Sequence, residues 1–447
     1  MAKRSDFAVT SLPLVTSAIN TTLNGQYAGL LPIVSCLARF KIITALLQND
    51  IGIMTQNAEG KIDNYFFWYF PAAPGVISSN LVVWFNGGPG CSSLEGLFTE
   101  HGPIMFNSSG SLYANPYGWH NQANVLYVEQ PVGTGFSVDN TKKSYDEIAL
   151  AGYFASFLNN FYNVFNETKS YDLYLTGESY AGTYIPYIAT TLAKTKTSDG
   201  TDIKITGIGM GNPAMGQTLN SPTMDYNFFL ATNNFWNSSS LKSQATACLT
   251  TNCSVGSLAS AWYTLNDNTF GVGNTCFDPY NVYFTMPCDN AFSDHGYLAE
   301  QAMSNFLNVR KTASVRNAIH LTSLASTFTW SECSSIHLTS TNAASQTLLA
   351  NLISLGIKVL IYDGNYDSVC DYISVETALA KLVWGGGTGF SNESNPWNIG
   401  THQGGLIWDE RGLKYIRVFG VGHMVGADDP TKAARLLNEL LTSSTDT

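Results

Sequence analysis

Short apolar runs alternate with longer amphipathic stretches along most of the chain. Each apolar run is closed by glycine, proline, asparagine or aspartate, as buried strands are. Strands are predicted at 81–85, 125–128, 171–176, 203–213, 358–367 and 413–423. Helical spacing marks 144–165, 181–190, 344–355 and 430–441. Strands that alternate with helices predict an α/β protein with a mostly parallel central sheet.

The N-terminal part predicts the first hairpin of that sheet, with an unusual segment inside it. A strand that begins near Tyr27 and continues through LLPI is expected to pair with 64–70, NYFFWYF. Residues 34–50, VSCLARFKIITALLQND, are apolar and basic, and they separate two strands that should be neighbours. Two interpretations stay open: a helical insertion on the surface, or, for about 34–48, translated intron sequence.

The composition changes between 214 and 305. Asn, Ser and Thr become frequent, strand signals fade, and four cysteines occur at Cys248, Cys253, Cys276 and Cys288. This predicts an inserted cap held by two disulfides, and sequence does not choose among the three possible pairings. We therefore divide the chain into a first core part at 1–213, with 34–50 as an atypical insertion, a cap at 214–305 and a second core part at 306–447.

Composition and charge exclude several classes of partner. Charged residues make up only 12% of the 447 residues, and the net charge is −11, which argues against nucleic acid and acidic membrane surfaces. The sequence contains no run of 18 apolar residues, so no membrane span is predicted. The isoelectric point of about 5.0 favours an acidic working environment.

Eight cysteines and six Asn-x-Ser/Thr sequons indicate a secretory history. The first residues, MAKRSDFAVTSLPLV, contain no convincing apolar signal core. We nevertheless expect a secreted or vacuolar protein. A sequon also begins at Asn20, and N-glycans are expected at Asn107, Asn166, Asn237, Asn252 and Asn392.

The stretch 171–189, YDLYLTGESYAGTYIPYIA, predicts a strand, a sharp turn and a helix, with Ser179 at the turn. A serine on such a turn takes a strained backbone, and the small residues Gly177, Ala181 and Gly182 let neighbouring chain approach it. The turn also aims the first helix amides at the place where an oxyanion would form. Ser179 is therefore predicted to be a nucleophile.

Two later strands end in loops that carry partners for this serine. Asp367 follows VLIY and His423 follows YIRVF. Catalytic groups of open α/β sheets lie beyond the carboxyl ends of strands. The order Ser, Asp, His is that of the α/β hydrolases, in which His423 would take the proton from Ser179 and Asp367 would orient the imidazole. The remaining histidines lack the spacing of metal ligands, so neither a metal nor another cofactor is expected.

Several stretches together resemble the serine carboxypeptidases of the carboxypeptidase Y type. They are WFNGGPGCSS at 84–93, YVEQPVGTGFS at 127–137, GESYAG at 177–182, the Asp367 strand and GHMV at 422–425. The resemblance implies an α/β-hydrolase fold with an inserted cap, and release of C-terminal residues from peptides at acidic pH through an acyl-enzyme. It implies an oxyanion hole formed by the amides of Gly88 and Tyr180.

The resemblance also implies a site for the substrate's terminal carboxylate, formed by Asn86, the Gly87 amide, Glu178 and Glu100. A carboxyl group can donate to a carboxylate only while it is protonated, and two adjacent carboxyls hold a proton more tightly than one. Such a site is expected to work in acid and to weaken as the pair ionises. Without the resemblance, Glu100 would be taken as a solvated helix residue.

Further expectations from the resemblance concern cysteines and the substrate pocket. Cys91 is expected to be bridged to Cys333, and Cys370 to be a free thiol near the catalytic Asp. Cys370, Met424 and Glu95 are expected to line the pocket, with Glu95 favouring basic terminal residues. Three positions depart from the family pattern: Asn365 replaces a usual Asp, Asp371 a usual Asn, and Gly426 a usual Pro.

Two alternatives remain open at this point. An acyltransferase on the same fold would use the same triad with another acceptor in place of water. It would not need a site for a free carboxylate, so Asn86, Glu178 and Glu100 together favour the peptidase. A catalytically inert binding protein is the second alternative, and the predicted triad argues against it.

Overall fold

The structure is a computed structural model. It describes residues 2–9, 25–32, 63–107, 109–141, 145–215, 275–287, 297–308, 313–321, 324, 328–336, 338–339 and 345–442. The segment 34–50, most of the predicted cap and Cys36, Cys248, Cys253 and Cys288 lie outside these residues. Among the described helices, none combines the length and apolarity needed to cross a membrane.

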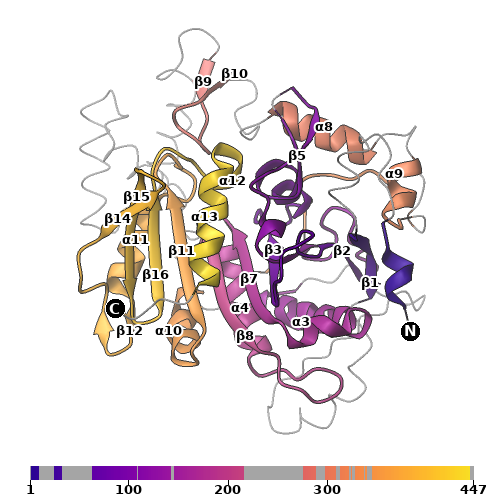
Figure 1. The fold of residues 1–447 in the computed structure, drawn as a ribbon, viewed down its shortest axis with the longest axis horizontal. Coiled ribbons are helices and arrows are strands. Elements are labelled where there is room, and N and C mark those ends of the chain that lie inside the picture. Colours follow the sequence, from indigo (N-terminus) through magenta and orange to yellow (C-terminus); the bar gives the residue numbers. More distant parts are fainter. Residues whose placement is uncertain are drawn as a thin grey trace.

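A ten-stranded sheet runs through the molecule in the order β1-β2-β6-β3-β7-β8-β11-β16-β15-β14 (Figure 1). Its strands are β1 (Tyr27–Pro32), β2 (Asn64–Phe70), β3 (Asn80–Phe85), β6 (Asn124–Glu129), β7 (Asp172–Glu178), β8 (Ile205–Gly211), β11 (Lys358–Gly364), β14 (Asn395–Ile399), β15 (His402–Glu410) and β16 (Leu413–Val418). The six central strands, from β6 to β16, are parallel. Antiparallel pairs extend both edges. This confirms the predicted α/β-hydrolase architecture.

The predicted first hairpin is present. Strands β1 and β2 pair antiparallel, with Tyr27 opposite Tyr69 and Pro32 opposite Asn64. Aromatic residues fill β2, and every side chain from Tyr65 to Phe70 is buried. A strand buried on both faces reads as a continuous apolar run, which is why NYFFWYF was recognisable.

Helices cover both faces of the sheet, and the two hydrophobic clusters of the core lie between these layers. The first face carries α3 (Glu147–Val164), α4 (Ala181–Leu192), α10 (Gln346–Ser354) and α11 (Tyr372–Lys381). The second face carries α8 (Tyr297–Asn308), α9 (Ala313–Ala318) and α13 (Pro430–Leu441), together with a π-helical turn at Gly96–Glu100. Figure 1 shows α4 beside β7 and β8, with α3 next to α4.

Short elements complete the described chain. They are 3-10 turns at Arg4–Phe7, Trp119–Asn121 and Asn166–Ser170, helix α12 (Val425–Asp428), and strands β4 (Ile104–Phe106), β5 (Leu112–Ala114), β9 (Thr275–Phe277), β10 (Thr285–Pro287), β12 (Val383–Trp384) and β13 (Gly387–Thr388). The predicted helix at 430–441 has the predicted bounds because Asp429 caps it, accepting from the amides of Thr431 and Lys432, and a proline opens it.

Candidate active site

Ser179 lies between β7 and α4 in the left-handed backbone region, with φ of 58°. A non-glycine residue seldom adopts this conformation, and the neighbouring chain holds it in place. The Ser179 amide donates to the Gly211 carbonyl at 3.0 Å, and its carbonyl accepts from the amides of Gly182 and Ala214, both at 2.9 Å. The predicted strand, turn and helix therefore form a strained elbow, as the sequence pattern requires of a nucleophile.

Small residues around the elbow are required by close packing. A Cβ at Gly177 would lie 2.3 Å from the Phe85 carbonyl oxygen, and one at Gly87 would lie 2.6 Å from both the Ser179 Cβ and the Tyr180 amide nitrogen. Distances this short are forbidden to real side chains. The glycine turn after β3 thus presses directly on the elbow, which brings two segments far apart in sequence to one place.

Asp367 and His423 form a short buried pair. His423 Nδ1 lies 2.6 Å from Asp367 Oδ2, and both side chains are buried. Asp367 also accepts from Asn212 Nδ2 at 2.8 Å and from the amides of Val369 at 2.7 Å and Cys370 at 3.2 Å. These contacts fix the orientation of the Asp367 carboxyl group, which in turn orients the imidazole of His423.

A segment of the predicted cap supports the His423 loop, which the sequence did not indicate. The His423 amide donates to the Tyr280 carbonyl at 2.7 Å, and the two rings meet edge to face at 5.1 Å. The same segment contacts the Asp367 loop, since the Val282 amide donates to the Tyr366 carbonyl at 3.0 Å. No motif identifies these contacts, because most are made by backbone atoms.

The predicted oxyanion amides come from these two converging segments. Gly88 has φ of +106°, a conformation that requires glycine, and it follows the Gly87 that packs against the Tyr180 amide. Tyr180 opens helix α4, so its amide is one of the first-turn donors that a helix offers to an anion.

Asn86 has an orientation fixed by its own donors. Its side-chain oxygen accepts from Trp84 Nε1 at 2.7 Å and from the Gly96 amide at 3.2 Å. Its nitrogen must therefore point the other way, where it donates to Glu178 Oε1 at 2.9 Å and Glu95 Oε2 at 3.2 Å. The buried Asn86 amide therefore donates to two carboxylates, and one of them belongs to Glu178, the residue directly before Ser179.

Glu100 is buried, not solvated. It ends the π-helical turn, and its Cβ would lie only 2.7 Å from a Cβ at Gly426, one of the departures from the family pattern. Burial, followed by the charges of Glu100 and Glu178, raises the pKa of the Tyr362 hydroxyl well above its usual value. Both carboxyls therefore act electrostatically on the same buried hydroxyl.

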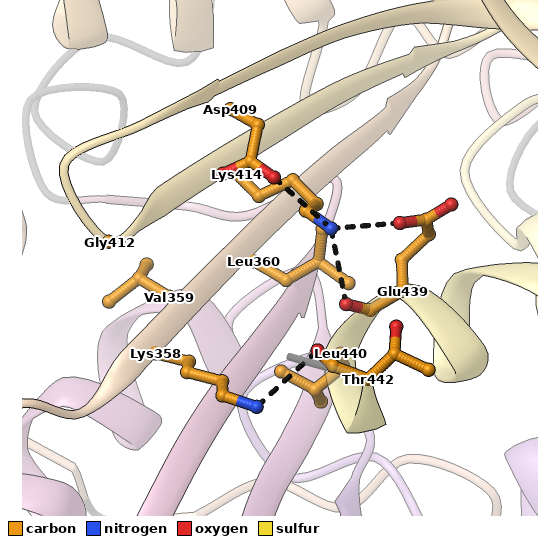
Figure 2. A pocket seen from close by; sticks show the side chains of 9 residues that line it. All are labelled: Lys358, Val359, Leu360, Asp409, Gly412, Lys414, Glu439, Leu440 and Thr442. Carbon is orange, nitrogen blue, oxygen red and sulfur yellow. Dashed lines mark hydrogen bonds and ion pairs between the residues drawn. The ribbon is translucent and has the colours of Figure 1, made fainter. Parts of the chain in front are cut away.

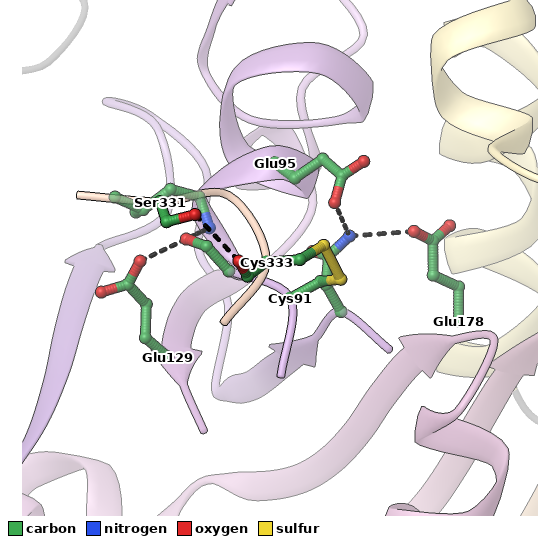
Figure 3. Close-up of a disulfide and its surroundings, with 9 residues drawn as sticks. Cys91, Glu95, Glu129, Glu178, Ser331 and Cys333 are labelled. Carbon is green, nitrogen blue, oxygen red and sulfur yellow. Dashed lines mark hydrogen bonds between the residues drawn. A yellow bond between two sulfur atoms is a disulfide. The ribbon is translucent and has the colours of Figure 1, made fainter. Parts of the chain in front are cut away.

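Carboxylates also gather around Glu95. Its carboxylate comes within 4.8 Å of those of Glu300, from α8, and Glu332. Figure 3 shows Glu95 and Glu178 pointing toward the same space beside the disulfide. Of the other predicted pocket residues, Met424 is buried, and Cys370 is half-buried and forms no disulfide with a described cysteine. Sequence reasoning placed Glu95 in the pocket but missed its contact with Asn86.

The disulfide joins Cys91 to Cys333, as the resemblance implied. It fixes the segment after the glycine turn to residues 330–334, beside a buried carboxyl that the sequence analysis overlooked (Figure 3). Glu129 accepts from Ser92 Oγ, from Trp330 Nε1 at 3.0 Å and from the Phe136 amide at 2.6 Å. Burial raises its pKa from 4.5 to about 7 despite these donors.

A separate small pocket of about 40 Å³ lies where β11 begins, at the opposite end of that strand from Asp367 (Figure 2). Its lysines are already engaged: Lys414 Nζ lies 2.8 Å from Glu439 Oε2 and 3.4 Å from Asp409 Oδ2, and Lys358 Nζ donates to the Thr442 carbonyl at 3.4 Å. The ion pair of Lys414 with Glu439 and the hydrogen bond of Lys358 join α13 and its C-terminal end to the sheet. The pocket is remote from the candidate site.

A serine elbow and an Asp and His pair beyond parallel strands are the features typical of serine hydrolases of the α/β-hydrolase fold. Residues 47–443 match the serine carboxypeptidase family, peptidase S10. A serine carboxypeptidase-like 36 of Arabidopsis thaliana is 31% identical over 84% of this chain and 79% of its own length. A pheromone-processing carboxypeptidase kex1 of Aspergillus oryzae is 28% identical over 85% of this chain.

The chain belongs to the serine carboxypeptidase family. It spans 63% of the length of the Aspergillus relative. The crystal structure of Kex1(delta)p, a prohormone-processing carboxypeptidase from Saccharomyces cerevisiae, superposes with a TM-score of 0.78 over 98% of this chain and 96% of that chain, at 23% identity. That likeness establishes the shared fold.

Proposed function

We propose that this protein is a serine-type carboxypeptidase that releases single residues from peptide C-termini at acidic pH. In this reaction Ser179 attacks the last peptide bond, and His423 takes its proton and then gives it to the leaving amino acid. Asp367 holds the imidazole in the required tautomer. The amides of Gly88 and Tyr180 stabilise the oxyanion. Water, giving a proton to His423, then attacks the acyl carbon; the bond to Ser179 Oγ breaks, Ser179 recovers its proton from His423, and the shortened peptide leaves.

The observation that carries this proposal is the Asn86 amide, which points between the Glu178 and Glu95 carboxylates beside the elbow. A general hydrolase has no use for a buried donor and several carboxyls next to its nucleophile. A carboxypeptidase does, because the terminal carboxylate of its substrate must be bound there. With one proton shared in the Glu178 and Glu100 neighbourhood, Asn86, the Gly87 amide and a neutral carboxyl can all donate to that carboxylate.

The pH dependence follows from this arrangement. When the carboxyls ionise, they lose the donated proton and repel the substrate's terminal carboxylate. Binding of the free C-terminus therefore weakens as the pH rises, so KM increases. Acylation by an uncharged ester depends on His423 being neutral and does not weaken in the same way.

Hydrolysis of an N-blocked dipeptide with a free C-terminus, compared with its C-terminal ester, tests the proposal. We expect release of the terminal amino acid at pH 5, loss of release in Ser179→Ala, and a ratio of peptide to ester hydrolysis that falls towards neutral pH. Cleavage of the ester alone at every pH would contradict carboxylate recognition and would favour an acyltransferase. Absence of any Ser179-dependent reaction would contradict the enzyme itself.

The acidic cluster around Glu95 supports acceptance of basic terminal residues. Three carboxylates within 4.8 Å of one another form an acidic surface that attracts a positive charge. A lysine or arginine side chain at the substrate terminus would supply it. In this arrangement Glu95, Cys370 and Met424 form the pocket for the residue that is released.

We further propose that the protein acts as a secreted or vacuolar glycoprotein. Of the expected glycan sites, Asn107, Asn166 and Asn392 lie in the described part of the chain, and all three are exposed. The Cys91–Cys333 bridge is of the kind that forms in oxidising compartments. A shift in electrophoretic mobility on treatment with an endoglycosidase would test this, and no shift for protein made in a eukaryotic host would contradict it.

A further inference from the structure

A second buried aspartate lies behind the predicted catalytic pair. Asp363 is the next-to-last residue of β11, four positions before Asp367, and it is fully buried. Among the described residues, no hydrogen-bond donor reaches either of its carboxyl oxygens in good geometry. A buried polar group without a hydrogen bond destabilises the folded protein, and a buried charge without one destabilises it far more.

The neighbouring cation does not compensate Asp363. Arg417 is its partner in the β16 register, but the guanidinium turns to α11, where its Nε and Nη2 donate to Glu376 at 2.7 and 2.6 Å. Its guanidinium also lies 4.5 Å from the centre of the Tyr372 ring. The Tyr415 hydroxyl lies near enough to favour the ionised form of Asp363, yet its hydrogen bond goes to Glu376 Oε1 at 3.1 Å.

The other groups that face Asp363 are acidic. They are Asp367 from the following loop, and Asp371 and Glu376 from the start and the body of α11. Asp367 and Asp371 are each fully buried and accept backbone amides. Both are therefore acceptors that cannot compensate a further negative charge. Burial, followed by Asp367 and Glu376, raises the pKa of Asp363 well above its usual value.

We propose that Asp363 is a positioning residue that holds the Asp367 loop in place only while it carries a proton. As a neutral acid it fills the space beneath residues 365–371 without adding charge. When the proton leaves, a fourth carboxylate appears beside Asp367, Asp371 and Glu376, and the loop opens to admit water. The amides of Val369 and Cys370 then leave Asp367, and His423 loses its oriented partner.

The direction of the effect follows from linkage. A carboxyl whose pKa is raised in the closed structure stabilises that structure below its usual value near 3.8, and the stabilisation is lost as the pH rises. Each pH unit between that value and the pKa of the closed state multiplies the open fraction about tenfold. Recognition of a substrate carboxylate plays no part in this opening of the loop.

Hydrogen exchange of the Val369 and Cys370 amides tests the proposal, because both are bonded to Asp367 and exchange only when the loop opens. Base-catalysed exchange alone rises about tenfold per pH unit, and loss of the Asp363 proton on opening multiplies this by about ten again. We expect exchange of these amides to rise about 100-fold per pH unit from pH 5 to 7.5 in the unmodified protein. In Asp363→Asn, which stays neutral, we expect about tenfold.

Controls separate local opening from other causes. The β3 amide of Val83 reports global unfolding, and Asp202→Asn removes a charge from an exposed surface ion pair with Lys196. We expect Asp202→Asn to follow the unmodified protein. If Asp363→Asn fails to fold, the slope of the unmodified protein decides alone, and a tenfold slope overturns the proposal. A 100-fold slope that persists in Asp363→Asn also overturns it.

A second readout reports on the catalytic serine. The rate at which a fluorophosphonate modifies Ser179 needs the triad but no substrate carboxylate. The quantity to compare is the modification rate at pH 7.5 divided by the rate at pH 5. We expect this ratio to be at least about threefold higher in Asp363→Asn than in the unmodified protein. Identical pH profiles would overturn the positioning role, and they would do so whether or not the protein cleaves peptides.

Discussion

The burial and the contacts of Glu129 predict how the free energy of unfolding depends on pH. Its carboxyl is fully buried, and its pKa is raised from 4.5 to about 7 by burial, with Ser92, Trp330 and the Phe136 amide partly opposing the rise. The folded protein therefore binds the Glu129 proton more tightly than the unfolded chain does. Since one pKa unit is worth about 1.4 kcal/mol, the rise corresponds to about 3 kcal/mol.

The sign follows from linkage. A carboxyl with a raised pKa in the folded state contributes its stability below the usual value of 4.5, and this contribution is lost as the pH rises to about 7. The unmodified protein should therefore lose about 3 kcal/mol of its free energy of unfolding across this window through Glu129 alone. Above about pH 7 the folded protein holds the carboxylate, which its three donors then satisfy.

Replacement by glutamine removes the titration at a cost in hydrogen bonding. Glutamine offers one acceptor where Glu129 offers two, so its NH₂ group faces the Phe136 amide or the Trp330 indole. An unsatisfied buried donor costs about 1–3 kcal/mol. Glu129→Gln should therefore be less stable than the unmodified protein by about that amount at pH 4.5, and the difference should shrink or reverse near pH 7.

Urea unfolding at several pH values between 4.5 and 7.5 measures both effects, with Asp202→Asn as the surface control. The free energy of unfolding is plotted against pH for the unmodified protein and for Glu129→Gln. If the two curves stay parallel within about 0.5 kcal/mol, the reasoning is refuted, because the substitution would then have removed contacts without removing a titrating group. Equal m-values are needed for the comparison, since a changed m-value would report a different unfolded or native state.

The remaining predictions concern activity. Asp367→Asn should lower kcat by about 10⁴-fold with little change in KM, because the asparagine favours the wrong His423 tautomer; steady-state kinetics on the dipeptide would show it, and a loss under tenfold would count against the assignment. Glu95→Gln should lower the ratio of kcat/KM for terminal Lys over terminal Leu by about tenfold, and an unchanged ratio would remove Glu95 from the pocket. Mercurial inhibition should disappear in Cys370→Ser, and undiminished inhibition would mean that another thiol is responsible.

The sequence was sufficient to predict the central sheet and the elbow. Buried parallel strands appear as short apolar runs, and the elbow needs glycine or alanine at fixed positions around Ser179, so both leave local signals. The closing helix was predictable from Asp429 and Pro430 at its start. The edge strands β14 and β15 were missed because they are partly exposed and mix glycine, asparagine and charged residues, which weakens the alternating pattern.

The supporting contacts of the site were beyond sequence reasoning for a different reason. The Tyr280 carbonyl holds the His423 amide, and a carbonyl has no residue signature. Glu129 and Asp363 looked like ordinary acidic residues, and their perturbed state depends on which distant side chains surround them. Burial is a property of the fold as a whole, so local periodicity cannot supply it.

The three departures from the family pattern fit the geometry of the site. Asn365 keeps the loops of Asp367 and His423 together, since its side-chain oxygen accepts from the Gly420 amide at 2.7 Å. Asp371 caps α11 by accepting from the amides of Ile373 and Ser374 at 3.0 Å, which an aspartate does as well as an asparagine. Gly426 lets α12 approach the backbone of Glu100. Each substituted residue therefore has a defined role in positioning a loop or a helix at the site, which is why the changes are compatible with an intact pair of Asp367 and His423.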